Sequence, residues 1–159
     1  MCWVYAPRPK NLGIPQCTSI AAAKLGMDLT FAFPEGYEID PVYMENARQM
    51  AEESSATIDV VRNLEEAVQG ADVIYAKSFG SHALSPEEDM AQRETLKDWI
   101  IKPEHFEKAN KNAVFMHALP IDRNIEAREE VIDGPHSIIY DEAENRLHVQ
   151  KAILSLVMG

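Results

Sequence analysis

The sequence is poor in cysteine, and its two thiols, Cys2 and Cys17, stand in no Cys-x-x-Cys or Cys/His spacing. That pattern is not typical of a disulfide framework or a metal site, and it predicts two inert core thiols in a reducing compartment. Long apolar runs are missing too, since none approaches the ~20 residues that span a bilayer. Met1–Tyr5 has neither the basic segment nor the cleavage site of a secretion signal. We therefore expect a cytoplasmic protein without a membrane partner.

Basic residues are scarce as well. Lys and Arg number 15 against 26 Asp and Glu, which gives a formal net charge of -11. Because nucleic-acid binding needs basic patches that neutralise phosphates, this composition excludes a nucleic-acid partner. No Gly-x-Gly-x-x-Gly follows the first apolar segment, which disfavours a nucleotide-binding protein. Neither a cofactor nor a metal ion is expected.

The sequence does contain short apolar segments that alternate with capped helical patterns over 159 residues, the length of one domain. The segments are rich in Val, Ile and aromatic residues, as buried parallel strands are. The predicted strands are Cys2–Tyr5, Asp28–Ala32, Thr57–Val61, Val73–Lys77, Val114–His117 and Ser137–Tyr140. This order predicts an α/β fold, with a Rossmann-like, mostly parallel sheet flanked by helices.

Capping residues mark the ends of the predicted helices. Glycine tolerates the positive φ that ends many helices, Asp before Pro is typical of a helix start, and Asn with Glu three residues later forms a capping box. The predicted helices run from Pro15 to Leu25 before Gly26, from Asp40 and Pro41 onward, and between Asn63 and Gly70.

The last helix is predicted to open at Asp141, which forms a capping box with Glu144. Behind this start, Val149, Ile153 and Leu156 recur at helical spacing. We interpret this apolar stripe as part of the core.

Two segments interrupt the alternation, the proline-rich stretch 5–15 and the long, acidic stretch 78–102. Both follow predicted strands, as does the Leu-Pro turn after His117. Ligands of open parallel sheets bind beyond the carboxyl ends of the strands, so these loops predict a crevice there. With Lys77 and His117 at its edge, the crevice would suit an anionic substrate.

A plainer interpretation of these residues is structural. A single histidine or lysine at a strand end is more often a structural hydrogen-bonding group than a catalyst. Asp122, Arg123 and Glu126 read on their own as a solvated charge cluster, whose surface ion pairs contribute only ~0-1 kcal/mol.

Two motifs change this balance, His117 to Asn124 (HALPIDRN) and Asp141 to Ala152 (DEAENRLHVQKA). They resemble the C-terminal half of carbamoyltransferases, in which a His-Cys-Leu-Pro or His-Pro-Leu-Pro loop lies against the carbamoyl group. The segments Trp3–Tyr5, Gly26–Thr30 and Gly70–Ser78 extend the resemblance to N-acetylornithine transcarbamylase and its knotted relatives. In those relatives a later segment passes through a ring formed by the proline-rich loop. The resemblance therefore implies a deep trefoil knot.

The resemblance also implies a reaction, the transfer of the carbamoyl group of carbamoyl phosphate to the amine of N-acetylornithine or a related compound in arginine biosynthesis. The implied catalytic residues are His117, Ala118, Leu119 and Arg123. The main-chain carbonyls of Ala118 and Leu119 would accept hydrogen bonds from the carbamoyl NH2. Arg123 would bind the carbonyl or phosphate side.

The implied substrate-binding residues are Lys77, Ser78 and Glu126. Lys77 would meet the α-carboxylate of the substrate. Glu126 stands where a relative carries a carboxylated lysine, and would supply the same negative charge.

The chain departs from the family pattern in three respects. Ala118 replaces the cysteine of ornithine-type members, and Asp122 stands where acetylornithine relatives carry an arginine. No Ser-x-Arg-Thr-Arg phosphate loop and no His-Pro-x-Gln occur in the sequence. We therefore expect residues 1–159 to form a single domain of the C-terminal, amino-acid-binding type without the carbamoyl phosphate domain, and to be inactive alone.

The expected partners follow from this assignment. They are an ornithine derivative, and carbamoyl phosphate only where the missing domain is present. The family is trimeric, and the isolated domain is expected as a monomer or weak dimer. The alternatives are an ornithine or putrescine carbamoyltransferase fragment, a small amino-acid-binding protein, or a non-catalytic knotted domain used as a folding model.

Overall fold

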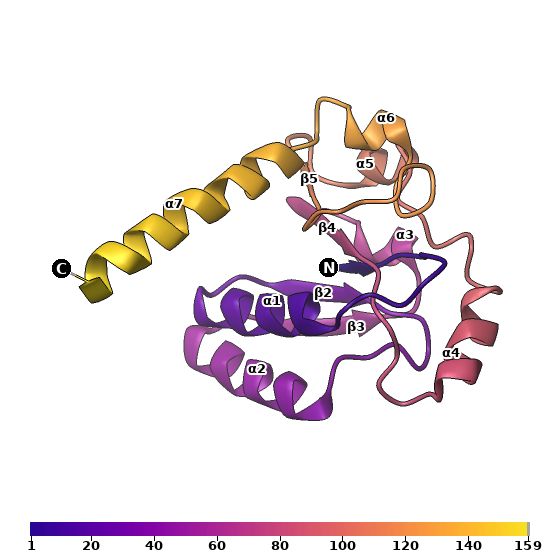
Figure 1. Cartoon of the computed structure of the whole chain (residues 1–159), viewed down its shortest axis with the longest axis horizontal. Helices are drawn as coiled ribbons and strands as arrows, with labels where there is room; N and C mark the ends of the chain where they lie inside the picture. Colours follow the sequence, from indigo (N-terminus) through magenta and orange to yellow (C-terminus); the bar gives the residue numbers. More distant parts are fainter. Residues whose placement is uncertain (159) are drawn as a thin grey trace.

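A five-stranded parallel sheet forms the centre of the protein, whose computed structural model describes residues 1–158 (Figure 1). The strand order is β3-β2-β1-β4-β5, and all pairs are parallel. The strands are β1 (Cys2–Trp3), β2 (Leu29–Ala32), β3 (Ile58–Val61), β4 (Val73–Lys77) and β5 (Val114–Met116). The predicted α/β, mostly parallel fold is confirmed.

Helices lie on both sides of this sheet. They are α1 (Gly13–Lys24), α2 (Pro41–Ser54), α3 (Leu64–Ala67), α4 (Pro86–Arg93), α5 (Glu104–Lys108), α6 (Glu129–Ile132) and α7 (Ile139–Met158). Helices α1 and α2 lie side by side over one face (Figure 1). Buried residues of α3 and α6 pack on the other face. None of the helices in residues 1–158 is long and apolar enough to cross a membrane.

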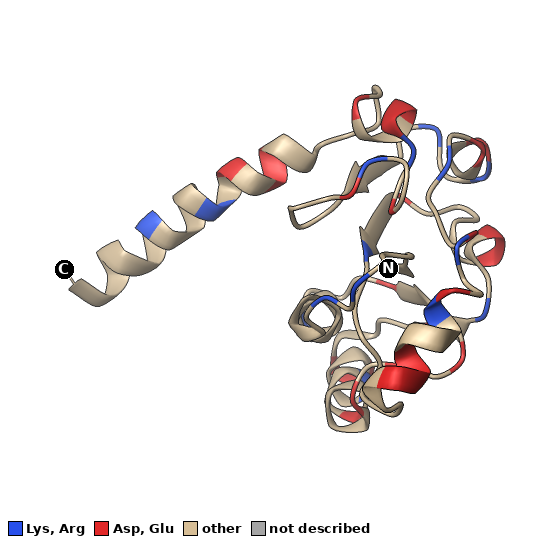
Figure 2. Cartoon of the chain, turned by 45° about the vertical axis from the view of Figure 1, so that its right-hand side comes forward, with Lys and Arg blue, Asp and Glu red and all other residues tan. Residues whose placement is uncertain are grey.

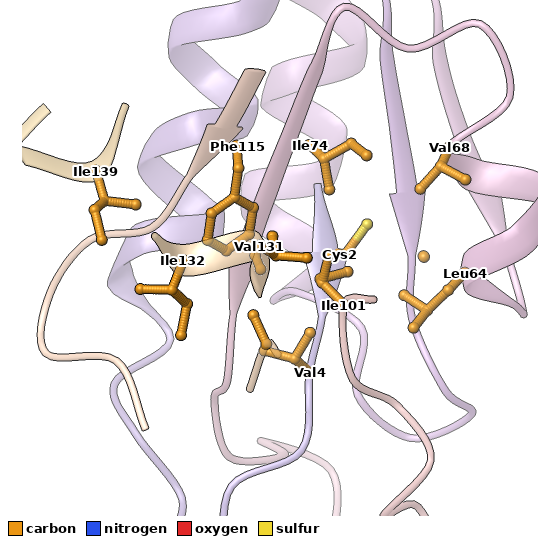
Figure 3. Packing of buried hydrophobic residues seen from close by; sticks show 13 residues of the cluster. Cys2, Val4, Leu64, Val68, Ile74, Ile101, Phe115, Val131, Ile132 and Ile139 are labelled. Atoms are coloured by element: carbon orange, nitrogen blue, oxygen red, sulfur yellow. The ribbon is translucent and has the colours of Figure 1, made fainter. Parts of the chain in front are cut away.

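The alternation of side chains along each strand divides the core in two. Cys2 and Val4 join the cluster under α3 and α6, shown in Figure 3, whereas Trp3 joins an aromatic cluster on the α1 side. Successive residues of a strand point to opposite faces, and a sheet covered on both faces therefore needs apolar residues throughout. Charged residues accordingly lie mainly on helices and loops (Figure 2).

Most predicted helix ends are confirmed. The Asp40 side chain accepts a hydrogen bond from Val42 N at the start of α2, and that of Asn63 accepts one from Glu66 N before α3. Gly26 and Gly70 have φ of 69° and 65°. Only glycine adopts these angles without strain, so both helices end where the sequence predicts.

The predicted sixth strand, Ser137–Tyr140, is wrong. Ser137 makes only an isolated bridge to Phe115, and α7 already begins at Ile139. Ile139 is buried against the core, so tertiary packing outweighs the β propensity of this β-branched segment. Since Asp141 lies inside the first turn, the predicted helix start there is wrong as well.

The interpretation of the last apolar stripe as core is also wrong. Val149, Ile153 and Leu156 are 56%, 53% and 84% exposed, and Ile139 is the one buried residue of α7. Figure 1 shows α7 projecting away from the sheet, and its last turns carry no charge in Figure 2. Nothing within residues 1–158 covers this face of the helix.

Two smaller expectations need correction. Cys2 is buried as predicted, but Cys17 lies on the exposed side of α1 and is not a core thiol. The 78–102 segment, predicted to interrupt the alternation, contains a helix of its own, α4, which opens with a capping box between Ser85 and Glu88.

Candidate functional site

A cavity with a volume of about 730 Å³ lies at the carboxyl edge of the sheet. Its walls come from the proline-rich loop and α1, from β4, from the loop after β5, and from the first turns of α7. The lining residues are Lys10, Asn11, Ile14, Tyr75, Lys77, His117, Ala118, Leu119, Pro120, Glu142, Ala143 and Arg146. A smaller cavity of about 280 Å³, bordered by α5 and α6, contains none of the predicted site residues.

Glu126 lies beneath this cavity and is fully buried. One of its oxygens accepts hydrogen bonds from Ser78 N (3.3 Å) and lies 3.2 Å from His117 Nε2. The other accepts from Lys10 Nζ (2.5 Å) and Asp122 N (2.8 Å). Burial alone would raise the pKa of Glu126, but the contacts with His117, Lys10 and Asp122 outweigh it and lower that pKa to about 2. Glu126 is therefore a buried carboxylate that joins three loops.

His117 is also fully buried. Its Nε2 faces the Glu126 carboxylate, which only accepts hydrogen bonds, so Nε2 carries the proton. Its Nδ1 has no partner in the described structure. Its main-chain N–H donates to the Glu142 carboxylate at 2.9 Å. In this conformation the imidazole supports the loop from below.

Among the predicted site residues, Lys77 is the one that places a charged group at the cavity wall. Its Nζ donates to the main-chain oxygen of Ala118 at 2.9 Å. Burial lowers the pKa of Lys77, and the nearby Glu126 carboxylate opposes that effect. An ammonium has three donors, so two N–H groups remain for a ligand. Its neighbour Ser78 is buried and contacts Glu126 through its main chain.

Arg123 lies elsewhere. It is exposed and forms a two-point ion pair with Asp133, with Nη2 donating to Oδ1 at 2.9 Å. It does not line the cavity. The structure thus brings Lys77, Ser78, His117, Ala118, Leu119 and Glu126 together, and it leaves Arg123 outside.

Three charged residues of the cavity lining escaped the sequence reasoning: Lys10, Glu142 and Arg146. Lys10 stood in the proline-rich loop already placed at this edge of the sheet. Glu142 and Arg146 belong to the DEAENR motif and are four residues apart, so they share one face of α7. This spacing could have predicted that both side chains face the same cavity.

The chain is similar to a known protein family over most of its length. Residues 15–157 match the family model described as aspartate/ornithine carbamoyltransferase, Asp/Orn binding domain. The chain is 44% identical over 140 residues to ornithine carbamoyltransferase of Methanothermobacter thermautotrophicus, covering 88% of this chain and 46% of that protein. It is 38% identical over 164 residues to N-acetylornithine carbamoyltransferase of Xanthomonas campestris, covering 100% and 48%.

A crystal structure of N-acetyl-L-ornithine transcarbamylase superimposes with a TM-score of 0.92 at 38% identity, covering 98% of this chain and 48% of that one. A structure of acetylornithine transcarbamylase complexed with acetylcitrulline gives the same score. The chain spans about half the length of the relatives it matches. It therefore belongs to the aspartate/ornithine carbamoyltransferase family, within which it matches the amino-acid-binding domain.

Proposed function

We propose that this chain is the amino-acid-binding half of a carbamoyltransferase that acts on an N-acylated ornithine. The observation that carries the proposal is the charge of the cavity. Three cations, Lys10, Lys77 and Arg146, line it, against one carboxylate, Glu142, whose two oxygens are both hydrogen-bonded. Such a cavity suits an amine substrate that enters with its carboxylate foremost.

The same balance favours an acylated α-amine. A free α-ammonium needs a carboxylate with spare acceptor capacity, because a charge removed from water must be paired. Glu126 and Glu142 are engaged by main-chain and side-chain donors, and Asp122 pairs with Lys10 at 3.0 Å. Ornithine itself is the second candidate, since relatives of both kinds match the chain. Putrescine has no carboxylate for Lys77 and fits least.

The proposed roles follow from position. Lys77 binds the α-carboxylate with its two free N–H groups, and the carbonyls of Ala118 and Leu119 accept the carbamoyl NH2. Arg146, which lines the cavity, takes the oxyanion or phosphate side that the sequence had suggested for Arg123. In the reaction the substrate nitrogen bonds to the carbamoyl carbon, the bond from that carbon to the phosphate oxygen breaks with its electron pair, and the departing phosphate takes the proton that the nitrogen loses. Ser78 and His117 contact Glu126 beneath the cavity, and the three residues support its loops.

We propose further that the other half of the enzyme supplies the phosphate site and covers α7. The chain spans about half the length of its relatives, and a helix with a largely apolar, exposed last half is suited to burial against another domain. The isolated chain should then form no citrulline-type product. Turnover above the uncatalysed rate would contradict the proposal that the other half supplies the phosphate site.

A binding series tests the substrate. We expect N-acetylornithine to bind the chain with a Kd in the ~millimolar range, because half of the contacts are missing. Ornithine should bind more weakly and putrescine should not bind measurably. Calorimetry and NMR shifts at Lys77 report the order. Tighter binding of ornithine would select the second candidate, and shifts confined to α2 would reject the site.

The trefoil knot also stays a proposal. What supports it is the contact of the proline-rich loop with the chain after β4, where Gly80 N donates to Lys10 O at 3.1 Å. A side chain at Gly80 would meet Pro9, with a Cβ only 2.9 Å from that of Pro9.

Pulling the chain from both termini tests the knot. An unknotted chain extends to ~3.3–3.6 Å per residue, and a tightened knot leaves the extended length short by several residues. A full-length extension would refute the knot.

A further inference from the structure

Glu142 occupies an unusual position at the edge of the cavity. It lies in the first turn of α7, where Oε1 accepts a hydrogen bond from the Tyr75 hydroxyl at 2.7 Å. Its other oxygen accepts from His117 N at 2.9 Å. Tyr75 is the middle residue of β4 and His117 follows β5, so one carboxylate bridges two neighbouring strands.

This bridge is also the main polar attachment of α7. Ile139 is the one buried residue of the helix, and most of the remaining length is exposed. Arg146 stands one turn after Glu142 and lines the same cavity. The contacts of Glu142 therefore set the distance between Arg146 and the loop that begins at His117.

Glu142 thus holds the loop that begins at His117. In the proposed function, carbonyls of this loop accept hydrogen bonds from the carbamoyl NH2. With His117 N tied to Glu142 and Ala118 O tied to Lys77, the main chain is fixed on both sides of the 117–118 peptide. Hydrogen bonds to an ionised carboxylate are shorter and stronger than neutral ones. Burial and the contact with Glu142 raise the pKa of Tyr75, so its hydroxyl remains a donor at neutral pH.

We propose that Glu142 is a positioning residue for carbamoyl transfer, which orients the carbonyls of Ala118 and Leu119 and places Arg146 opposite them. The proposal rests on the proposed function. Lys77, which is proposed to bind the α-carboxylate, contacts the same loop through Ala118 O. The inference concerns the carbamoyl end of the cavity, formed by the two carbonyls and Arg146.

The experiment compares two ligands that differ at that end. N-acetylcitrulline carries the carbamoyl group, and N-acetylornithine does not. In Glu142→Ala the affinity for N-acetylcitrulline should fall about tenfold or more, whereas that for N-acetylornithine should change less than about threefold. Calorimetry on the whole chain measures both. The matched control is Glu144→Ala, because Glu144 is exposed on the same helix and its carboxylate, within residues 1–158, pairs only with His148.

Two further variants separate positioning from folding. Glu142→Gln keeps the bridge, since its amide oxygen accepts from His117 N and its NH2 donates to the Tyr75 oxygen, and it should restore N-acetylcitrulline binding. Tyr75→Phe removes the hydrogen bond from the Tyr75 hydroxyl to Glu142 and should weaken the binding of N-acetylcitrulline alone. Amide hydrogen exchange at His117 should accelerate about tenfold in Glu142→Ala and remain unchanged in Glu144→Ala.

The outcomes are distinguishable. Equal loss of both ligands in Glu142→Ala, or no loss of either, overturns the positioning role and leaves the proposed function standing. If Glu142→Ala does not fold, an unchanged N-acetylcitrulline affinity in Tyr75→Phe overturns it equally. If the wild-type chain binds neither ligand, the proposed function fails and this inference falls with it.

Discussion

Two buried charge clusters lie on either side of Ser78. In one, Glu126 accepts hydrogen bonds from the Ser78 main chain and from Lys10 beneath the cavity. In the other, Arg93 donates to the Ser78 hydroxyl at 3.3 Å and to Phe79 O at 2.6 Å. Both Glu126 and Arg93 are fully buried, yet only the first cluster borders the cavity.

The Arg93 cluster is built as a structural anchor. Arg93 pairs with Asp89, with Nε 2.9 Å from Oδ1 but without hydrogen-bond geometry, and Asp89 accepts from the Tyr37 hydroxyl at 2.6 Å. The guanidinium also lies 5.4 Å from the ring centre of Trp3, within cation-π range. These contacts hold α4 against the sheet.

The comparison teaches that burial of charge does not by itself identify a functional site. Glu126 and Arg93 are equally inaccessible, and each lies next to a residue of opposite charge. They differ in what surrounds them, since the partners of Glu126 include cavity-lining residues and those of Arg93 do not. The predictions below test whether this difference separates ligand binding from stability.

The largest effect is expected from Arg93→Met. Removing one partner of a buried pair leaves Asp89 uncompensated, which costs about 3–5 kcal/mol of stability. Urea unfolding measures the loss, with Arg48→Met, at an exposed position of α2, as the control. In the fraction that remains folded, N-acetylornithine affinity should stay within about threefold. A larger loss of affinity would show that the anchor also shapes the site.

Glu126→Gln should act on both stability and binding, and with a particular pH dependence. The pKa of Glu126 is lowered from 4.5 to about 2, so its carboxylate contributes about 3 kcal/mol that is complete above pH 4.5 and is lost as the pH falls through 2. The difference in stability between wild type and variant should therefore be largest near pH 7 and should close by about pH 2.

Urea unfolding across this pH range, with the exposed Glu53→Gln as control, checks the prediction. A difference that stays constant with pH would mean that the charge of Glu126 is not what stabilises the loops.

The smallest effect is expected from Lys77→Met, which keeps the length of the side chain and removes its charge. N-acetylornithine affinity should fall about tenfold, or about 1.4 kcal/mol, with little change in stability. The exposed Lys24→Met serves as the control in the same titration. An unchanged affinity would show that Lys77 does not bind the ligand. Lys77 would then no longer support a ligand-binding role for the Glu126 side of Ser78, as distinct from the Arg93 side.

Features that depend on local geometry could be predicted from the sequence. Five of six predicted strands and the caps at Asp40, Asn63, Gly26 and Gly70 are found, because short apolar segments and capping residues act through neighbours along the chain. The motif after His117 likewise placed the cavity at the correct edge of the sheet.

Tertiary structure decided the rest. Lys10 reaches Glu126 across 116 positions of sequence, and Tyr75 reaches Glu142 across 67, and no local pattern encodes such pairs. The packing of Ile139 turned a predicted strand into the start of α7. The apolar stripe on that helix looked like core because periodicity records which face is apolar, whereas only the arrangement of the fold decides whether anything covers it.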